Sequence, residues 1–152
     1  MMLIERHKVK AQAGFTLIEL VIAILIISIL GAIAYPNYVG SITRTKRKAA
    51  EACLSNFATH MERFYTTNLR YDQDAGGTAV ALPSLECATT QARDYVFSLS
   101  TSTAVTRSTY LLQAVPQTAN KQSTRDARCG TLTLDQGGNR GVLGTDTVAN
   151  CW

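Results

Sequence analysis

Residues 12–38 read QAGFTLIELVIAILIISILGAIAYPNY, and this stretch decides which folds are open to the chain. No charged residue occurs from Leu20 to Tyr35. A helix needs about 20 residues to cross the apolar core of a bilayer, so residues 15–35 are long enough to span it. The stretch therefore predicts a transmembrane helix, followed by one modest globular domain over residues 36–152.

Three residues of the apolar stretch are unusual in a membrane helix. Glu19 is a carboxylate near its start, and a charge in a bilayer is so costly that it normally marks a binding partner or a pathway. The alternative is that Glu19 lies at the level of the lipid headgroups. Gly31 weakens a helix by about 1 kcal/mol and Pro36 by about 3 kcal/mol or more. For an isolated chain, these residues predict a continuous helix with a kink at Pro36.

The four cysteines, at positions 53, 87, 129 and 151, all follow the apolar stretch. Their even number and wide spacing favour two disulfides in an oxidising compartment, and disfavour zinc, whose ligands usually come in closely spaced pairs. The positions alone allow three pairings. Lys and Arg number three before the stretch and four soon after it, so they do not set its orientation. The cysteines place residues 1–14 in the cytoplasm and the bulk of the chain outside.

The segment after the apolar stretch predicts an α+β domain. Apolar residues recur at mostly three- or four-residue steps between Val39 and Phe64, which is the pattern of an amphipathic helix. Short β-forming segments bounded by turn residues follow at 95–99, 109–115 and 130–135. We therefore expect a long helix packed on a small antiparallel sheet. The residues predicted on the buried face of the helix are Val39, Ile42, Ala49, Cys53, Phe57, Met61 and Phe64.

A basic group, Arg44 to Lys48, lies on this helix just outside the predicted membrane segment. It could bind lipid headgroups, DNA or the acidic groups of a neighbouring chain, but a solvated helix face is the interpretation we favour. The formal net charge of +4 is too small to indicate a nucleic-acid partner by itself. DNA binding is therefore possible, but the sequence does not support it.

Two kinds of N-terminal processing compete. An ordinary secretory signal would be cut after Ala32-Ile33-Ala34, and the product would be a secreted, disulfide-stapled binding protein. The apolar stretch is longer than in an ordinary signal, and an acidic residue near its start is unusual there. Both features favour cleavage before the stretch, after Gly14, so that the helix stays in the mature protein.

The residues around Gly14 resemble a known family. GFTLIEL, residues 14–20, has a short basic leader before it and an unbroken apolar segment after it, and it resembles the class III signal of type IV pilins and type II secretion pseudopilins. CGTLTLDQGGNRG…NCW at the C-terminal end resembles PilE-type minor pilins. The resemblance implies the type IV pilin fold, a leader over residues 1–14, cleavage by prepilin peptidase between Gly14 and Phe15, and N-methylation of Phe15.

The resemblance also implies roles for single residues further along the chain. Glu19 of an arriving subunit would neutralise the Phe15 amine of its neighbour. In an assembled filament the helix would lose structure around Gly31 and Pro36. The disulfides that the resemblance implies are Cys53–Cys87 and Cys129–Cys151.

The implied function is a structural subunit of a type IV pilus, most like a minor pilin needed for assembly and for pilus-dependent motility or adhesion. A major pilin and a type II secretion pseudopilin are the alternatives. The expected partners are other pilin subunits, prepilin peptidase, the inner-membrane assembly machinery and the membrane. The chain would first be a single-pass protein of the bacterial inner membrane, with its C-terminal domain in the periplasm, and then part of an extracellular pilus.

We expect neither catalysis nor a metal or cofactor. The sequence contains no nucleophile elbow, metal-ligand cluster or phosphate loop. His60 has no plausible partner in sequence, and GGNRG (residues 137–141) lacks the lysine of a P-loop.

Overall fold

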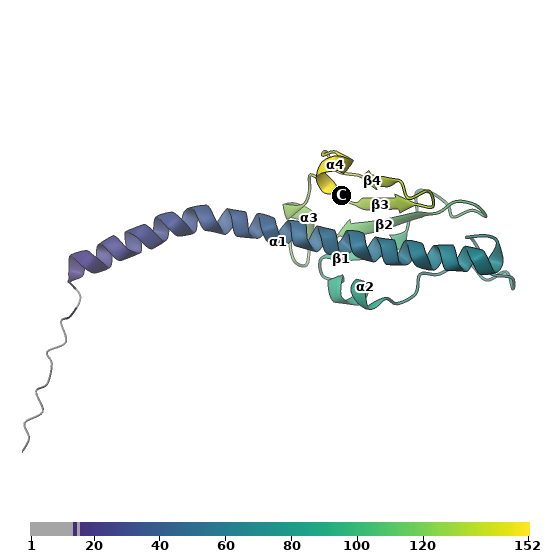
Figure 1. The fold of residues 1–152 in the computed structure, drawn as a ribbon, viewed down its shortest axis with the longest axis horizontal. Coiled ribbons are helices and arrows are strands. Elements are labelled where there is room, and N and C mark those ends of the chain that lie inside the picture. Colours follow the sequence, from purple (N-terminus) through teal and green to yellow (C-terminus); the bar gives the residue numbers. More distant parts are fainter. Residues whose placement is uncertain (1–13, 15) are drawn as a thin grey trace, which may run out of the picture. The chain divides into compact units, whose positions relative to one another are not determined.

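The computed structural model describes Gly14 and residues 16–152, which form two compact units that divide between Tyr38 and Val39 (Figure 1). One helix, α1 (Leu17–Asn68), contributes to both units. Phe15, at which the predicted transmembrane helix begins, lies outside the described residues.

The first unit consists of the N-terminal part of α1. Its large apolar side chains are exposed, from 46% at Val21 to 81% at Leu17. Within the described residues, α1 is the one helix that is long and apolar enough to cross a membrane. The helix is continuous through Gly31 and Pro36, as expected for an isolated chain, while the expected kink at Pro36 stays a prediction. Loss of helix at these residues in a filament stays a prediction.

The second unit contains a four-stranded antiparallel sheet whose strands lie side by side in chain order. Its strands are β1 (Tyr95–Leu99), β2 (Leu111–Pro116), β3 (Leu132–Asp135) and β4 (Arg140–Val142). The first three confirm the predicted segments to within two residues. Sequence analysis missed β4 because it is three residues long and has glycine at its centre.

Three short helices complete the described part of this unit, and the sequence predicted none of them. They are α2 (Glu86–Gln91), α3 (Gln122–Arg125) and α4 (Val148–Cys151). Segments of four to six residues are too short to show a helical period or to be stable alone, so packing against the rest of the unit holds them, together with a disulfide in α2 and in α4.

The core of the second unit lies between α1 and the sheet. From α1 it includes Leu54, Phe57 and Met61, each at most 2% exposed. Phe57 packs on Phe97 of β1 with 5.6 Å between ring centroids. This packing confirms the predicted architecture of a long helix on an antiparallel sheet. The other buried apolar residues of the cluster are Ala50, Cys53, Tyr71, Tyr95, Tyr110, Leu112, Ala114, Leu132 and Leu134.

The predicted buried face of α1 is wrong where it enters the second unit. There Ile42 and Ala49 are only half-buried, and the buried face runs through Thr43, Arg47 and Ala50. Arg47 lies in the one seven-residue step of the predicted face, between Ile42 and Ala49. A pattern of apolar residues alone does not place a charged side chain on the buried face. The 7% exposure of Arg47 also corrects our interpretation of the basic group as a solvated face.

Two disulfides join distant segments of the second unit. Cys53 of α1 bonds to Cys87 of α2, 34 residues later. Cys129 bonds to Cys151 of α4, 22 residues later, and this bond closes the C-terminal loop. These are the two pairings that the family resemblance implied.

Candidate functional site

The only carboxylate in the first unit's part of α1 is Glu19, in the first turn of the helix. Its main-chain N–H donates to the Thr16 hydroxyl over 3.3 Å, so Thr16 supplies an acceptor where α1 begins. An acidic residue is favourable at this end because the helix dipole is positive there. Glu19 has no ion-pair partner among the described residues, so a partner for it would come from outside this part of the chain.

The two predicted processing residues, Gly14 and Phe15, lie just before Glu19. Gly14 is exposed, and no heavy atom lies within 4 Å of the place where its Cβ would be. Phe15 lies outside the described residues. The structure therefore leaves the assignments of cleavage and methylation as predictions.

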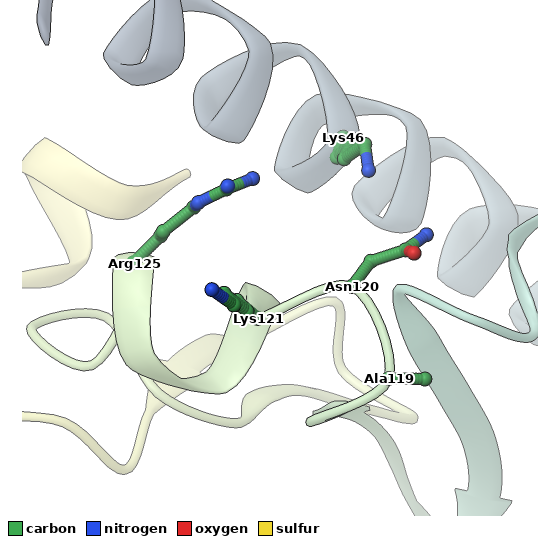
Figure 2. A pocket seen from close by; sticks show the side chains of 5 residues that line it. All are labelled: Lys46, Ala119, Asn120, Lys121 and Arg125. Carbon is green, nitrogen blue, oxygen red and sulfur yellow. The ribbon is translucent and has the colours of Figure 1, made fainter.

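A second candidate site is a hollow of about 330 Å³ at the end of the second unit where α1 enters it (Figure 2). We call it the basic hollow. Figure 2 shows Lys46 reaching from α1 toward Asn120, and Arg125 reaching toward α1 from α3. The residues that line it are Lys46, Ala119, Asn120, Lys121 and Arg125.

The three cations of the basic hollow are not equivalent. Lys46 Nζ lies 2.5 Å from Asp94 Oδ1, so this cation is compensated. Lys121 and Arg125 are exposed and form no ion pair with any acid in the described residues. Lys121 has a φ of 58° and precedes the first turn of α3, while Arg125 is its last residue. The hollow thus presents two uncompensated cations and one that already has a carboxylate partner.

This arrangement suits an anion rather than a metal ion. No group of three or more His, Cys, Asp or Glu side chains that could hold a metal ion occurs in the described part of the chain. Lys and Arg near an open hollow are the usual partners of phosphate oxygens. No aromatic side chain lines the basic hollow, so stacking with a nucleobase is not part of this site.

Beside the hollow, a buried polar network ties α1 to the C-terminal half of the unit. Arg47 Nη1 pairs with Asp126 Oδ1 and lies 2.9 Å from Cys129 Sγ. The Tyr95 hydroxyl donates to Asp126 Oδ2 over 2.5 Å, and Gln122 Nε2 donates to Tyr95 over 3.1 Å. Burial, together with the hydrogen bond to the Asp126 carboxylate, raises the pKa of Tyr95 above its ordinary value. The network anchors α3, which carries Arg125, against the helix that carries Lys46.

The predicted basic group therefore separates into three different environments. Arg44 and Lys48 are exposed, and Lys48 pairs with Glu51 over 2.9 Å. Lys46 lines the hollow, and Arg47 is buried in the network. Sequence analysis missed Lys121 and Arg125 because they lie about 75 residues away in a segment with no periodic pattern.

The glycine-rich stretch GGNRG (residues 137–141) forms the turn after β3 and the first two residues of β4. Asp135 Oδ1 accepts the main-chain N–H groups of Gly137 and Asn139, each over 2.8 Å. Burial acts to raise the pKa of Asp135, but the hydrogen bonds from Asn139 and Gly137 outweigh it and hold this pKa below its usual value. These amides point at a carboxylate of their own turn, so they are not arranged to hold a phosphate.

Comparison with known proteins identifies the chain's relatives. A family model described as "Type IV minor pilin ComP, DNA uptake sequence receptor" matches residues 36–133. A model described as "Prokaryotic N-terminal methylation motif" matches residues 9–35, which include the predicted cleavage site.

Two curated relatives match the chain over shorter segments. The type IV major pilin protein PilA of Myxococcus xanthus (strain DK1622) is 42% identical over 62 residues, which are 41% of this chain and 28% of that protein. A fimbrial protein of Pseudomonas aeruginosa is 49% identical over 53 residues, 35% of this chain and 34% of that protein. The matched segments thus span no more than 34% of these relatives' length.

Two solved structures resemble the chain over most of their own length. A type IV pilin from Shewanella oneidensis has 26% identity and a TM-score of 0.46, covering 72% of this chain and 97% of that one. The non-core minor pilin PilV of Neisseria meningitidis has 23% identity and a TM-score of 0.47, covering 74% and 95%.

Proposed function

The chain belongs to the type IV minor pilin ComP family, and from this premise we propose that it is a minor subunit of a type IV pilus that binds DNA at the basic hollow. The proposal has two parts, assembly through α1 and binding through the second unit. The basic hollow is the observation that favours DNA binding over adhesion or motility as the output of the pilus.

Assembly rests on the exposed apolar part of α1. Before assembly the subunit resides in the inner membrane, with the N-terminal part of α1 spanning the bilayer and the second unit in the periplasm. Prepilin peptidase cuts between Gly14 and Phe15 and methylates the new terminus, a step that the match to the methylation motif supports. Glu19 then pairs with the terminal amine of a neighbouring subunit. A lone carboxylate in an apolar helix needs such a partner when water is excluded.

The mass and N-terminal sequence of the mature chain, purified from its own cell envelope, test this part. We expect the chain to begin with N-methylated Phe15 and to retain the whole of α1. As a matched control, a Gly14→Asp variant should keep the mass of the uncut chain. A mature chain that begins at Tyr35 would overturn the proposal, because the apolar helix would then be a discarded secretory signal.

DNA binding rests on the two uncompensated cations of the basic hollow. Lys121 and Arg125 lie four residues apart at the two ends of α3, so both are presented on one short, anchored segment. Phosphate contacts by Lys and Arg release condensed counterions, which supplies a large share of protein–DNA affinity. Since the hollow has no aromatic lining, the proposed contact is with the phosphate backbone and does not read sequence.

An Arg125→Ala variant should therefore bind duplex DNA more weakly, with a shallower salt dependence. Each lost phosphate contact lowers the slope of log K against log [salt] by about 0.9. The measurement is fluorescence anisotropy of a labelled duplex across a NaCl series. Arg44→Ala, which removes an exposed cation of α1 that does not line the hollow, is the matched control and should leave the slope unchanged. If both variants lowered the slope equally, binding would be diffuse and the hollow would not be its site.

A further inference from the structure

Asp94 is held in one place by contacts with three parts of the second unit. Its carboxylate oxygen Oδ1 lies 2.5 Å from Lys46 Nζ and accepts a hydrogen bond of 3.0 Å from Asn120 Nδ2. Its main-chain N–H donates to Gln91 O over 2.7 Å, and its carbonyl accepts the Gln117 N–H over 2.8 Å. The Asp94 carboxylate thus contacts two of the polar side chains that line the basic hollow, those of Lys46 and Asn120.

This carboxylate occupies donors that an incoming phosphate would need. Lys46 is one of the three cations of the hollow, and Asn120 carries its only neutral polar side chain. Both direct a donor at the same Asp94 oxygen. The Asp94 side chain is only 14% exposed, so water does little to screen its charge from Lys46.

We propose that Asp94 is an internal competitor for phosphate that sets how many cations of the basic hollow an anion can engage. The inference rests on the proposed DNA-binding function, and assigns Asp94 as a residue that tunes the affinity of that same site. In the wild-type protein, DNA engages Lys121 and Arg125 but not Lys46, which is paired with Asp94. A weak anion that cannot reach both exposed cations is then rejected, whereas a polyanion that contacts them together is retained.

The salt dependence of DNA binding distinguishes a cation that contacts phosphate from one that is already paired with a carboxylate. Only a cation that exchanges its counterions for DNA phosphates contributes to the slope of log K against log [salt], at about 0.9 for each phosphate neutralised. Lys46 has exchanged its counterion for Asp94 already, so it contributes nothing in the wild-type protein. When Asp94 is replaced by an uncharged residue, Lys46 becomes available to phosphate and its contribution to the slope appears.

The test compares full-length mature chains in zwitterionic detergent micelles, with a labelled duplex as the probe. Asp94→Asn removes the charge but keeps an oxygen that can accept from Asn120. We expect this variant to bind more tightly, with a slope steeper by about 0.9. Lys46→Gln alone should leave the wild-type slope unchanged. The double variant, Asp94→Asn with Lys46→Gln, should return to the wild-type slope, because it lacks the Lys46 cation that Asp94→Asn alone makes available.

The outcomes separate the inference from the proposed function. If wild-type protein binds DNA but Asp94→Asn has the same slope, Asp94 is a structural clamp and the inference is overturned. If Lys46→Gln lowers the wild-type slope by about 0.9, Lys46 already contacts DNA and the inference is overturned. The Lys46→Gln measurement tests the inference even if Asp94→Asn does not fold. If only Asp94→Asn binds, the competition is supported while DNA binding by the natural protein is rejected.

Discussion

Replacing Arg47 with alanine is expected to lower the free energy of unfolding of the second unit by about 3–5 kcal/mol. The substitution leaves Asp126, which is 3% exposed, as an unpaired buried carboxylate. The Tyr95 hydroxyl would then be the only remaining donor to Asp126 among its present side-chain partners. The loss is therefore dominated by the cost of an uncompensated charge, rather than by the strength of the ion pair itself.

The measurement is urea unfolding of the full chain in detergent micelles, followed by tryptophan fluorescence. Trp152 is the single tryptophan, and its indole N–H donates to the Gly141 carbonyl over 3.0 Å, so it reports on the second unit. Lys48→Ala is the matched control, because Lys48 pairs with Glu51 but its side chain is 58% exposed. Exposed pairs contribute roughly 0–1 kcal/mol, so the control should lose no more than this.

A double variant distinguishes the buried charge from the packing of the side chains. Arg47→Met combined with Asp126→Leu removes both charges and keeps the space filled. We expect it to be clearly more stable than Arg47→Ala, because no unpaired charge remains. If Arg47→Ala unfolded with the same midpoint as wild type, the ion pair would be dispensable, and the anchoring of α3 against α1 would need another explanation.

The sequence could predict those parts of the fold whose pattern repeats along the chain. The apolar run of residues 15–35 and the helical period from Cys53 to Met61 each involve many residues of one chemical kind. The three predicted strands are likewise rich in residues of one kind, β-formers, but over shorter segments. Such patterns carry over into structure because burying apolar area is the dominant favourable contribution to folding.

The candidate site could be predicted only in its N-terminal part, for a different physical reason. GFTLIEL is a contiguous motif, so Gly14, Phe15 and Glu19 could be assigned from the sequence alone. The basic hollow joins Lys46 to Lys121 and Arg125 across the fold, and a charged side chain has no period that indicates which of its neighbours it will face. Whether Arg47 is buried likewise depended on Asp126, which lies 79 residues later.

Removing the Cys129–Cys151 disulfide, by changing both cysteines to serine, should lower the free energy of unfolding by about 3 kcal/mol. The bond closes a loop of 22 residues, and in the chain-entropy model its loss frees the unfolded chain to adopt many more conformations. Both sulfurs lie at buried residues, so the serine hydroxyls would also need hydrogen-bond partners. Urea unfolding of the double variant, followed by Trp152 fluorescence, measures the loss.

The Cys53–Cys87 bond is the matched comparison for this variant. It closes a longer loop, of 34 residues, so chain entropy alone predicts an equal or slightly larger loss when both of its cysteines become serine. The C-terminal loop has other attachments, since Gly144 donates to the Cys129 carbonyl over 3.0 Å and Asp146 to the Arg128 carbonyl over 2.8 Å. A loss below about 1 kcal/mol for Cys129 and Cys151 would show that these attachments suffice. A loss well above that of the longer loop would show that the bond also supports the Arg47 network, which Cys129 Sγ contacts in the native state.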